Sequence, residues 1–319
     1  MKSFFTAILF LTCSICYGQT YASLVAEANT AYNKKEYEKS VNAYQSAFKL
    51  ERKNANDLYN GACSAALLGK KDLALEWLTL AAKNGWSDIH HLKIDKDLNS
   101  LHGSKEWDKL VADLQVQVDQ REAKYDKPLQ KRLLAIYDDD QVIRREFLDA
   151  QRKFGNTSKQ VDSLGKIMMH KDSINLIKIV EILDTHGWVG PEKVGGQANQ
   201  TLFLVIQHAD LKTQQKYLPM MREAVKNKNA NASALALLED RIALREGKRQ
   251  VYGSQIGHDN ETNTYFILPL DDPDNVDKRR AAVGLGPLSE YVQRWNITWN
   301  VAEYKKQLPD IEAKQARQP

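Results

Sequence analysis

The sequence predicts a mainly α-helical chain of two modules, in which repeated helical hairpins precede a mostly helical domain with a small β-hairpin. Three observations support this fold class. Small and aromatic residues recur 34 positions apart near the start, apolar residues recur at helical spacing in the second half, and one pair of β-type segments lies near residue 260. With 319 residues and 43% hydrophobic content, the chain exceeds one typical domain of about 100 to 200 residues.

The repeat pattern occupies the first module. Five pairs align at this one constant spacing: Ala28 with Ala62, Tyr32 with Ala66, Ser40 with Ala74, Tyr44 with Leu78, and Ala47 with Ala81. Small residues let antiparallel helices approach closely, while the larger ones fill the gaps. Period and pattern resemble the tetratricopeptide repeat. Gly69 marks the turn inside the second repeat, and Lys35 takes its place in the first.

The first residues are typical of a secretory signal peptide. Lys2 gives a positive start, an apolar run extends from Phe4 to Cys16, and the small residue Gly18 follows. The run is shorter than the roughly 20 apolar residues that span a bilayer. We therefore expect cleavage after Gly18, a secreted or periplasmic location, and no membrane span in the mature chain. Cys63 then remains as its sole cysteine, so no internal disulfide can form.

Composition argues against several functional classes. The net charge is +4, and basic residues alternate with acidic ones, so we expect no nucleic-acid partner. Beyond the predicted signal peptide, which carries Cys13 and Cys16, the sequence contains no phosphate loop, no Gly-x-Gly-x-x-Gly, no paired cysteines and no His-Glu-x-x-His. Its seven histidines are scattered. We therefore expect neither a cofactor nor a metal.

The domain boundaries follow from composition and periodicity. We expect a signal peptide in residues 1–18, repeats with capping helices in 19–115, a helical linker in 116–128, a mainly helical domain in 129–300, and a tail in 301–319 that is frayed past Lys305. A protein or peptide partner of the repeats and a purely spacing role are both open. Asn29 and Asn60 are suited to contact a peptide backbone, but Val25 stands where a carboxylate-binding lysine would be expected.

Two helices of the second module have apolar stripes with polar ends. One is predicted to begin at Asp172, which caps it together with Asn175, and to stop at Gly187. Another contains Leu202–Ile206, which is apolar on every side, and ends at His208. The negative end of the helix dipole there favours the protonated imidazole, and Asp210 is close enough in sequence to hold it.

A third helix, Ser233–Glu246, places Arg241 on an apolar stripe. Burying a guanidinium without a partner costs several kcal/mol, so we expect a carboxylate beside it, from Asp210 or Asp272. Beyond Gly247, the segments 250–256 and 264–268 are predicted to pair as a β-hairpin. The last predicted helix bears Arg279 and Arg280.

The second module contains an ordered set of polar and glycine-containing motifs. They are Asp140-Gln141 with Arg144, Asp172 with Asn175, Gly187-Trp188, Val194-Gly195, Gln207-His208-Ala209-Asp210, Asp240-Arg241, Gln250 with Tyr252-Gly253-Ser254-Gln255, and Asp277 with Arg279-Arg280. This ordered set resembles a bacterial family catalogued as domain of unknown function 6624. Val189 and Ser254 depart from the usual proline and threonine. The resemblance identifies these residues as candidates for a functional role, but it implies no activity.

Two hypotheses follow for these polar residues. In the leading one, the chain is an exported cell-envelope protein that binds a partner through its repeats, and the polar residues form a buried network that fixes the fold. In the alternative, a hydrolase-like pocket uses His208, Asp210 and Arg241 for catalysis. Its candidate binding residues are Gln207, Tyr252, Gln255 and Arg280. Whether these residues meet at an open cleft or in a closed interior distinguishes the two.

Overall fold

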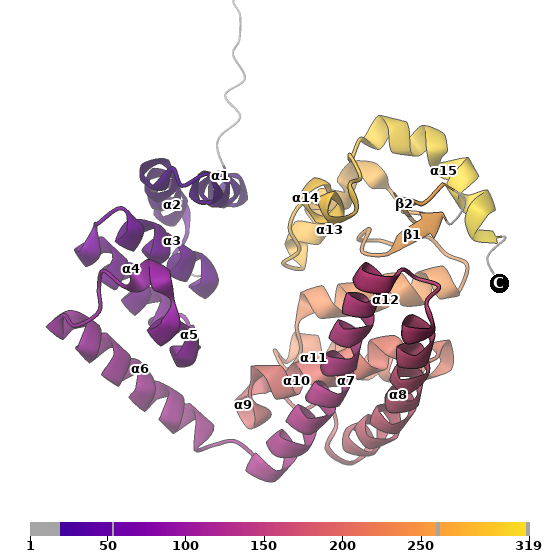
Figure 1. Ribbon diagram of the computed structural model, residues 1–319, viewed down its shortest axis with the longest axis horizontal. Coiled ribbons are helices and arrows are strands. Elements are labelled where there is room, and N and C mark those ends of the chain that lie inside the picture. Colours follow the sequence, from indigo (N-terminus) through magenta and orange to yellow (C-terminus); the bar gives the residue numbers. More distant parts are fainter. Residues whose placement is uncertain (1–19, 53, 260–261, 317–319) are drawn as a thin grey trace, which may run out of the picture. The chain divides into compact units, whose positions relative to one another are not determined.

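The computed structural model describes residues 20–52, 54–259 and 262–316, which form α-helices and one small sheet (Figure 1). The mainly helical fold class is confirmed. Two compact units are present, one up to Arg121 and one from Glu122 onward. The predicted signal peptide lies outside the described residues. Within the described ranges, no helix combines the length and the apolar character that crossing a bilayer requires.

The first unit consists of helical hairpins and a covering segment. Its elements are α1 (Tyr21–Asn33), α2 (Tyr37–Leu50), α3 (Ala55–Leu67), α4 (Lys71–Lys83), α5 (Ile89–Ile94), the 3-10 turn η1 (Lys96–Leu98) and α6 (Lys105–Glu122). The hairpins α1–α2 and α3–α4 pack on each other through α2 and α3. Leu92, Leu98, Trp107 and Leu110 from the covering segment complete the same core.

The constant spacing of the small residues reflects the packing of these hairpins. Ala28, Ala47, Ala62 and Ala81 are completely buried, which keeps the helix axes close. Gly61 serves the same purpose, because a Cβ there would lie 3.0 Å from ring atoms of both Phe48 and Trp77. Small residues at repeated positions thus set the distance between helices.

The turns of the two hairpins have the same left-handed backbone. Gly69 has φ +80° and Lys35, at the equivalent position of the first repeat, has φ 61°. A left-handed conformation costs a residue with a Cβ about 1 kcal/mol relative to glycine. We expect Lys35→Gly to raise the free energy of unfolding by about 0.5–1 kcal/mol in a denaturant titration. Gly69→Lys should lower it by a similar amount, and no change in either variant would contradict this account.

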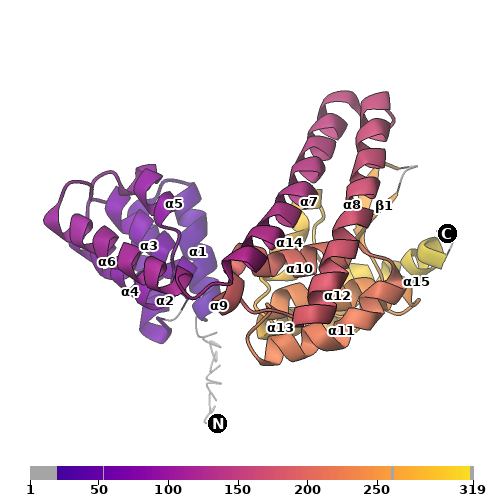
Figure 2. The same cartoon turned by 90° about the horizontal axis from the view of Figure 1, so that it is seen from below.

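The second unit begins with a long antiparallel helical hairpin, α7 (Lys127–Phe154) and α8 (Lys159–His186), which lie side by side (Figure 2). The short α9 (Pro191–Val194) leads into α10 (Gly196–His208), which packs across both. Two further helices, α11 (Leu211–Lys226) and α12 (Ala232–Arg245), pack against each other. Leu133, Ile179, Leu202 and Ile206 lie at the centre of their shared core.

Two helix boundaries differ from the prediction. Ser158 caps α8, which begins at Lys159 and not at Asp172, so Asp172 and Asn175 lie inside the helix and cap nothing. Residues 116–128 are not one helix, because α6 ends at Glu122 and α7 begins at Lys127. The Asp126 side chain accepts a hydrogen bond from the Leu129 N–H at 3.1 Å and caps a new helix start.

A small α/β substructure ends the unit. Its elements are β1 (Ile256–Asp259), β2 (Thr264–Ile267), η2 (Pro273–Asn275), α13 (Val276–Ala282), α14 (Leu288–Val292), η3 (Gln293–Trp295) and α15 (Val301–Ala316). The strands are antiparallel, with Ile256 opposite Ile267. The expectation of a frayed tail past Lys305 is wrong up to residue 316, because α15 buries Tyr304 and Ile311 against this substructure.

The first predicted strand is also wrong in position. β1 starts at Ile256, and of the segment 250–255 only Gln250 forms an isolated bridge, to Leu270. The backbone N–H groups of Val251, Tyr252 and Ser254 donate to the Asp240 carboxylate instead of to a strand. The Asp240 side chain of α12 therefore accepts the N–H groups that were predicted to bond to a neighbouring strand.

Candidate functional site

The C-terminal end of α10 carries the predicted histidine, and neighbouring helices hold this end in place. The last carbonyl groups of a helix lack partners within it. Here Gln214 of α11 donates to the Gln207 carbonyl at 2.8 Å, and Arg245 of α12 donates to the Ala209 carbonyl at 2.8 Å. Side chains of two other helices thus bind the backbone carbonyls on either side of His208 and fix its position.

A network of one arginine and two aspartates lies on the α7–α8 hairpin. Arg144 donates to both oxygens of Asp140, at 3.1 and 3.2 Å, and to Asp172 at 2.6 Å. The Asp140 side chain is 1% exposed and also accepts a hydrogen bond from Gln141 at 2.7 Å. Burial raises the pKa of Asp172, although Arg144 acts in the opposite direction. Arg144 therefore holds two helices and two carboxylates together.

His208 and Asp172 line the same cavity. It has a volume of about 290 Å³, and its wall is formed by Met169, Asp172, Ser173, Leu176, Val205, His208, Ala209 and Asp210. The first four residues come from α8, and the last four come from the end of α10 and the residues that follow it. This volume suits a small ligand, since ligand sites begin at about 300 Å³.

His208 is held in its neutral form. Burial lowers the pKa of its imidazole to about 4, and the positive charges of Arg144, Arg241 and Arg245 act in the same direction. The Asp140 carboxylate opposes them. The expectation that the helix dipole favours the protonated form is therefore wrong, because desolvation and three guanidinium groups outweigh it.

This shift predicts a pH dependence of stability. The unfolded chain binds a proton at its usual pKa of 6.5, and the folded chain binds it only near pH 4, so unfolding becomes easier as pH falls through that window. Between pH 7 and pH 4, the free energy of unfolding of wild type should fall by about 3 kcal/mol more than that of His208→Gln. Denaturant titrations at both pH values measure the difference. His186→Gln, at an exposed position, should behave as wild type.

Arg241 lacks the carboxylate partner that the sequence predicts. Asp210 caps α11 by accepting the Thr213 N–H at 2.8 Å, and Asp272 pairs with Arg279 at 3.2 Å. The Arg241 Nε is buried and has no hydrogen-bond partner among the described residues. Desolvation lowers the pKa of Arg241, and Arg245 adds to this effect. Both predicted partners are thus wrong, and the buried Nε–H of Arg241 has no acceptor among the described residues.

Asp240, the neighbour of Arg241, organises the loop before β1. Its completely buried carboxylate accepts the backbone N–H groups of Val251 at 2.7 Å, Tyr252 at 2.9 Å and Ser254 at 2.9 Å. Gln250 is equally buried, donating to two backbone carbonyls and accepting the Gln255 N–H at 2.8 Å. These bonds match the closed network of the first hypothesis.

The predicted binding residues divide between different environments. Arg280 is 1% exposed and donates to the carbonyls of Tyr252 at 2.7 Å and Gly286 at 2.6 Å, which is a structural role. The Gln255 side chain donates to the Ser254 hydroxyl at 3.0 Å. Gln207, Tyr252, Gln255 and Arg241 are not among the residues that line the His208 cavity. Of the predicted catalytic residues, the structure places His208 and Asp210 in that lining.

Comparison with known families assigns this unit. A model described as "Family of unknown function (DUF6624)" matches residues 127–301, from the start of α7 to the start of α15. The chain belongs to this family. No curated protein and no solved structure matched the chain. The resemblance that the sequence motifs suggested is therefore confirmed, and it covers both the His208 cavity and the Asp240 loop.

Asp172 of the DUF6624 domain is a functional candidate, although its sequence pattern predicts a helix cap. Arg144 is marked in the sequence only by its motif with Asp140 and Gln141, yet it bridges the hairpin and acts on His208. Asn175, one turn beyond Asp172, has both amide atoms buried without a hydrogen-bond partner among the described residues. The spacing of Asp172 and Asn175 places both on one face of a helix, which was the available signal.

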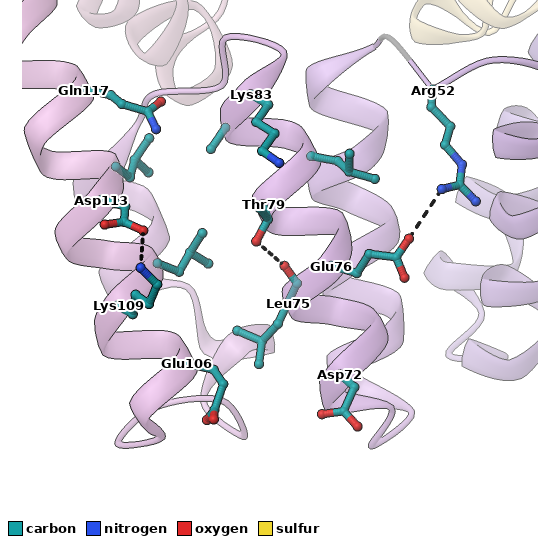
Figure 3. Close-up of a pocket in the computed structure, with 14 residues that line it drawn as sticks. Arg52, Asp72, Leu75, Glu76, Thr79, Lys83, Glu106, Lys109, Asp113 and Gln117 are labelled. Atoms are coloured by element: carbon teal, nitrogen blue, oxygen red, sulfur yellow. Dashed lines mark hydrogen bonds and ion pairs between the residues drawn. The ribbon is translucent and has the colours of Figure 1, made fainter.

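Outside the DUF6624 domain, a hollow lies between α4 and α6 in the first unit, which is called the repeat unit from here on. Its volume is about 600 Å³, and Figure 3 shows Leu75 and Thr79 of α4 opposite Lys109 and Asp113 of α6. Leu80, Leu110 and Leu114 add further apolar lining. Charged residues flank it, including the ion pairs Arg52–Glu76 at 3.4 Å and Lys109–Asp113 at 3.3 Å. An apolar floor with charged edges is typical of a surface that accepts a peptide or helix.

Proposed function

We propose that the DUF6624 domain binds a small anionic ligand in the His208 cavity and hydrolyses it with His208 as general base. One observation carries this proposal: a neutral imidazole lines a cavity beside a carboxyl group, within the field of three guanidinium groups. Strongly perturbed pKa values in a concave site are typical of catalytic centres. The positive field at His208 favours a ligand with negative charge.

The chemistry follows from the charge state of each group. A neutral imidazole at pH 7 can accept a proton as water attacks the carbonyl or phosphoryl centre of the ligand. The bond from that centre to the leaving oxygen then breaks, and the imidazolium returns the proton to the leaving oxygen. Arg241 and Arg144 do not line the cavity, but the positive field that they create at His208 favours negative charge as it develops on the ligand. Asp210 was the carboxylate predicted to hold the His208 imidazole. In this proposal Asp172, whose pKa is raised by burial, has that role instead.

Hydrolysis of the anionic ester p-nitrophenyl phosphate by the full chain, together with thermal shifts in inorganic phosphate and citrate, tests the proposal. We expect turnover of this ester, and a rise in melting temperature with at least one anion. His208→Gln should lower turnover by about 100-fold or more, and Arg241→Met should reduce the thermal shift. His186→Gln, at an exposed position on α8, is the matched control. Equal turnover and shifts in all three variants would exclude His208 from the site.

A second function, binding of a protein segment by the repeat unit, is supported by the hollow between α4 and α6. Its apolar floor suits an amphipathic helix or peptide, and its charged edges suit the polar side of such a segment. This role is independent of the His208 chemistry. It corresponds to the leading interaction hypothesis of the sequence analysis.

Site-specific photo-crosslinking tests the binding role. Thr79 lies in the hollow and Thr30 lies outside it; both are exposed, and both donate to the carbonyl four residues earlier. A photo-reactive residue at position 79 should give a discrete crosslinked product in cells, and the same residue at position 30 should not. Equal labelling at the two positions would contradict a specific partner.

Export is proposed from the apolar run at residues 4–16 and the small residue Gly18. Mass spectrometry of the mature protein from the envelope and extracellular fractions should find Gln19 as the first residue. Retention of Lys2 in the mature protein would contradict cleavage.

A further inference from the structure

The repeat unit holds a second cluster of reactive side chains in a separate pocket of about 480 Å³. Cys63 comes from α3, His91 from α5, and Asp95 and Asp97 from the segment where α5 passes into η1. The ligand atoms of Cys63, Asp95 and Asp97 all lie within 4.8 Å of one another. The His91 Nε2 and the Cys63 Sγ each lie 3.6 Å from the Asp95 Oδ2.

The backbone and neighbouring hydroxyl groups fix both carboxylates. Asp95 Oδ1 accepts the Asp97 N–H at 3.0 Å, and Asp95 Oδ2 accepts the Tyr59 hydroxyl at 2.7 Å. Asp97 Oδ2 accepts the Tyr32 hydroxyl, while no donor to Asp97 Oδ1 is found among the described residues. Asp97 therefore retains one carboxylate oxygen that is free to bind a ligand.

The charge of this pocket is unbalanced. Its lining contains two aspartates and no lysine or arginine, and the exposed His91 is the one side chain that can carry positive charge. Two carboxylates held near each other repel, and a bound cation removes that repulsion. The pocket thus favours a positively charged occupant.

The donor set distinguishes between cations. Calcium and magnesium prefer oxygen ligands alone, whereas a thiolate, an imidazole and carboxylates together are typical of zinc. Zinc binds sulfur at about 2.3 Å and nitrogen or oxygen at about 2.0–2.1 Å, so tetrahedral ligands lie about 3.3–3.7 Å apart. The two distances of 3.6 Å at Asp95 fall in this range.

We propose that Cys63, His91, Asp95 and Asp97 form a site for a divalent metal ion of the zinc class. Coordination requires the Cys63 thiolate, so binding releases its proton. The ion would join α3 to the segment between α5 and η1 and stabilise the end of the repeat unit. No metal is predicted from the sequence, because the seven histidines are scattered along it. The fold brings one of them, His91, to Cys63, Asp95 and Asp97.

Titration of the full chain with Co²⁺, a spectroscopic substitute for Zn²⁺, tests the site. Cys13 and Cys16 are replaced by serine so that Cys63 is the sole thiol. We expect a thiolate-to-cobalt absorption band that saturates at one equivalent and disappears when Zn²⁺ is added. Cys63→Ser should abolish the band, and His91→Gln and Asp97→Asn should each weaken Co²⁺ binding at least about 10-fold.

His90→Gln provides the matched control, since His90 is adjacent, exposed and absent from the pocket lining. It should bind Co²⁺ as tightly as the parent. Circular dichroism verifies that each variant is folded; if Cys63→Ser unfolds, Asp97→Asn decides. The proposal is overturned if no thiolate band appears, if the band persists in Cys63→Ser, or if His91→Gln and Asp97→Asn bind Co²⁺ like His90→Gln.

Discussion

Replacing Asp240 by alanine is expected to lower the free energy of unfolding by about 3–5 kcal/mol. The completely buried carboxylate accepts the backbone N–H groups of Val251, Tyr252 and Ser254, and its removal leaves all three without an acceptor. Asp240→Asn keeps one oxygen acceptor and should lose about 1–3 kcal/mol. Denaturant titration measures both changes.

Hydrogen exchange reports the same loss locally. In Asp240→Ala, the amides of residues 251, 252 and 254 should exchange much faster than in wild type. Glu239→Ala is the control, because its ion pair with Arg222 lies near the surface and contributes at most about 1 kcal/mol. A loss below about 1 kcal/mol for Asp240→Ala, with the three amides still protected, would refute the organising role of Asp240.

The second large effect is expected at Arg144. Arg144→Met leaves the Asp140 carboxylate, which is 1% exposed, without its counter-ion and removes the contact to Asp172. Breaking one side of a buried ion pair costs about 3–5 kcal/mol. Arg145→Met, at the adjacent exposed position, should change the free energy of unfolding by less than about 0.5 kcal/mol.

A double variant separates charge from packing. Because Asp140→Asn removes the uncompensated charge, Arg144→Met combined with Asp140→Asn should be more stable than Arg144→Met alone. Denaturant titrations of the four proteins give the coupling energy. The contradicting result is simple additivity. If Asp140→Asn destabilises the Arg144→Met variant by as much as it destabilises wild type, the two residues are not coupled and the account of this network is wrong.

The helical elements were predictable where one side chain pattern repeats. The alanines of the repeat mark helices that pack closely, and the apolar segment 202–206 of α10 lies in the core as expected, with Leu204 partly buried. The repeat interval even placed Lys35 at the backbone conformation that Gly69 adopts. In these segments, local pattern and tertiary packing favour the same structure.

The errors arise where a distant side chain decides the local structure. Segment 250–255 has a strand-like composition, yet Asp240 takes its backbone donors, and nothing in the segment itself reveals this. Asp172 resembles a helix cap, but α8 starts well before it, at Lys159, and Asp172 pairs with Arg144 across the hairpin. Asp210 and Asp272 were the predicted partners of Arg241, but Asp210 caps α11 and Asp272 pairs with Arg279.

The candidate site was predictable in part for the same reason. His208 and Asp210 follow one apolar helix, so the sequence placed them together, and both line the cavity. Asp172 reaches that cavity from α8, and Arg144 acts on His208 from α7, through contacts between helices that periodicity does not reveal. The charge state of His208 depends on those contacts, and it was therefore predicted with the wrong sign.

The ionisation of His208 tests the account most directly. A pH titration of the full chain followed by imidazole NMR resonances, with His208 assigned by comparison with His208→Gln, gives its pKa in the folded protein. The account predicts an imidazole that stays neutral at pH 6 and titrates near pH 4. A midpoint at or above 6.5 would show an exposed or carboxylate-paired histidine and would contradict the buried, neutral imidazole on which the account of this cavity depends.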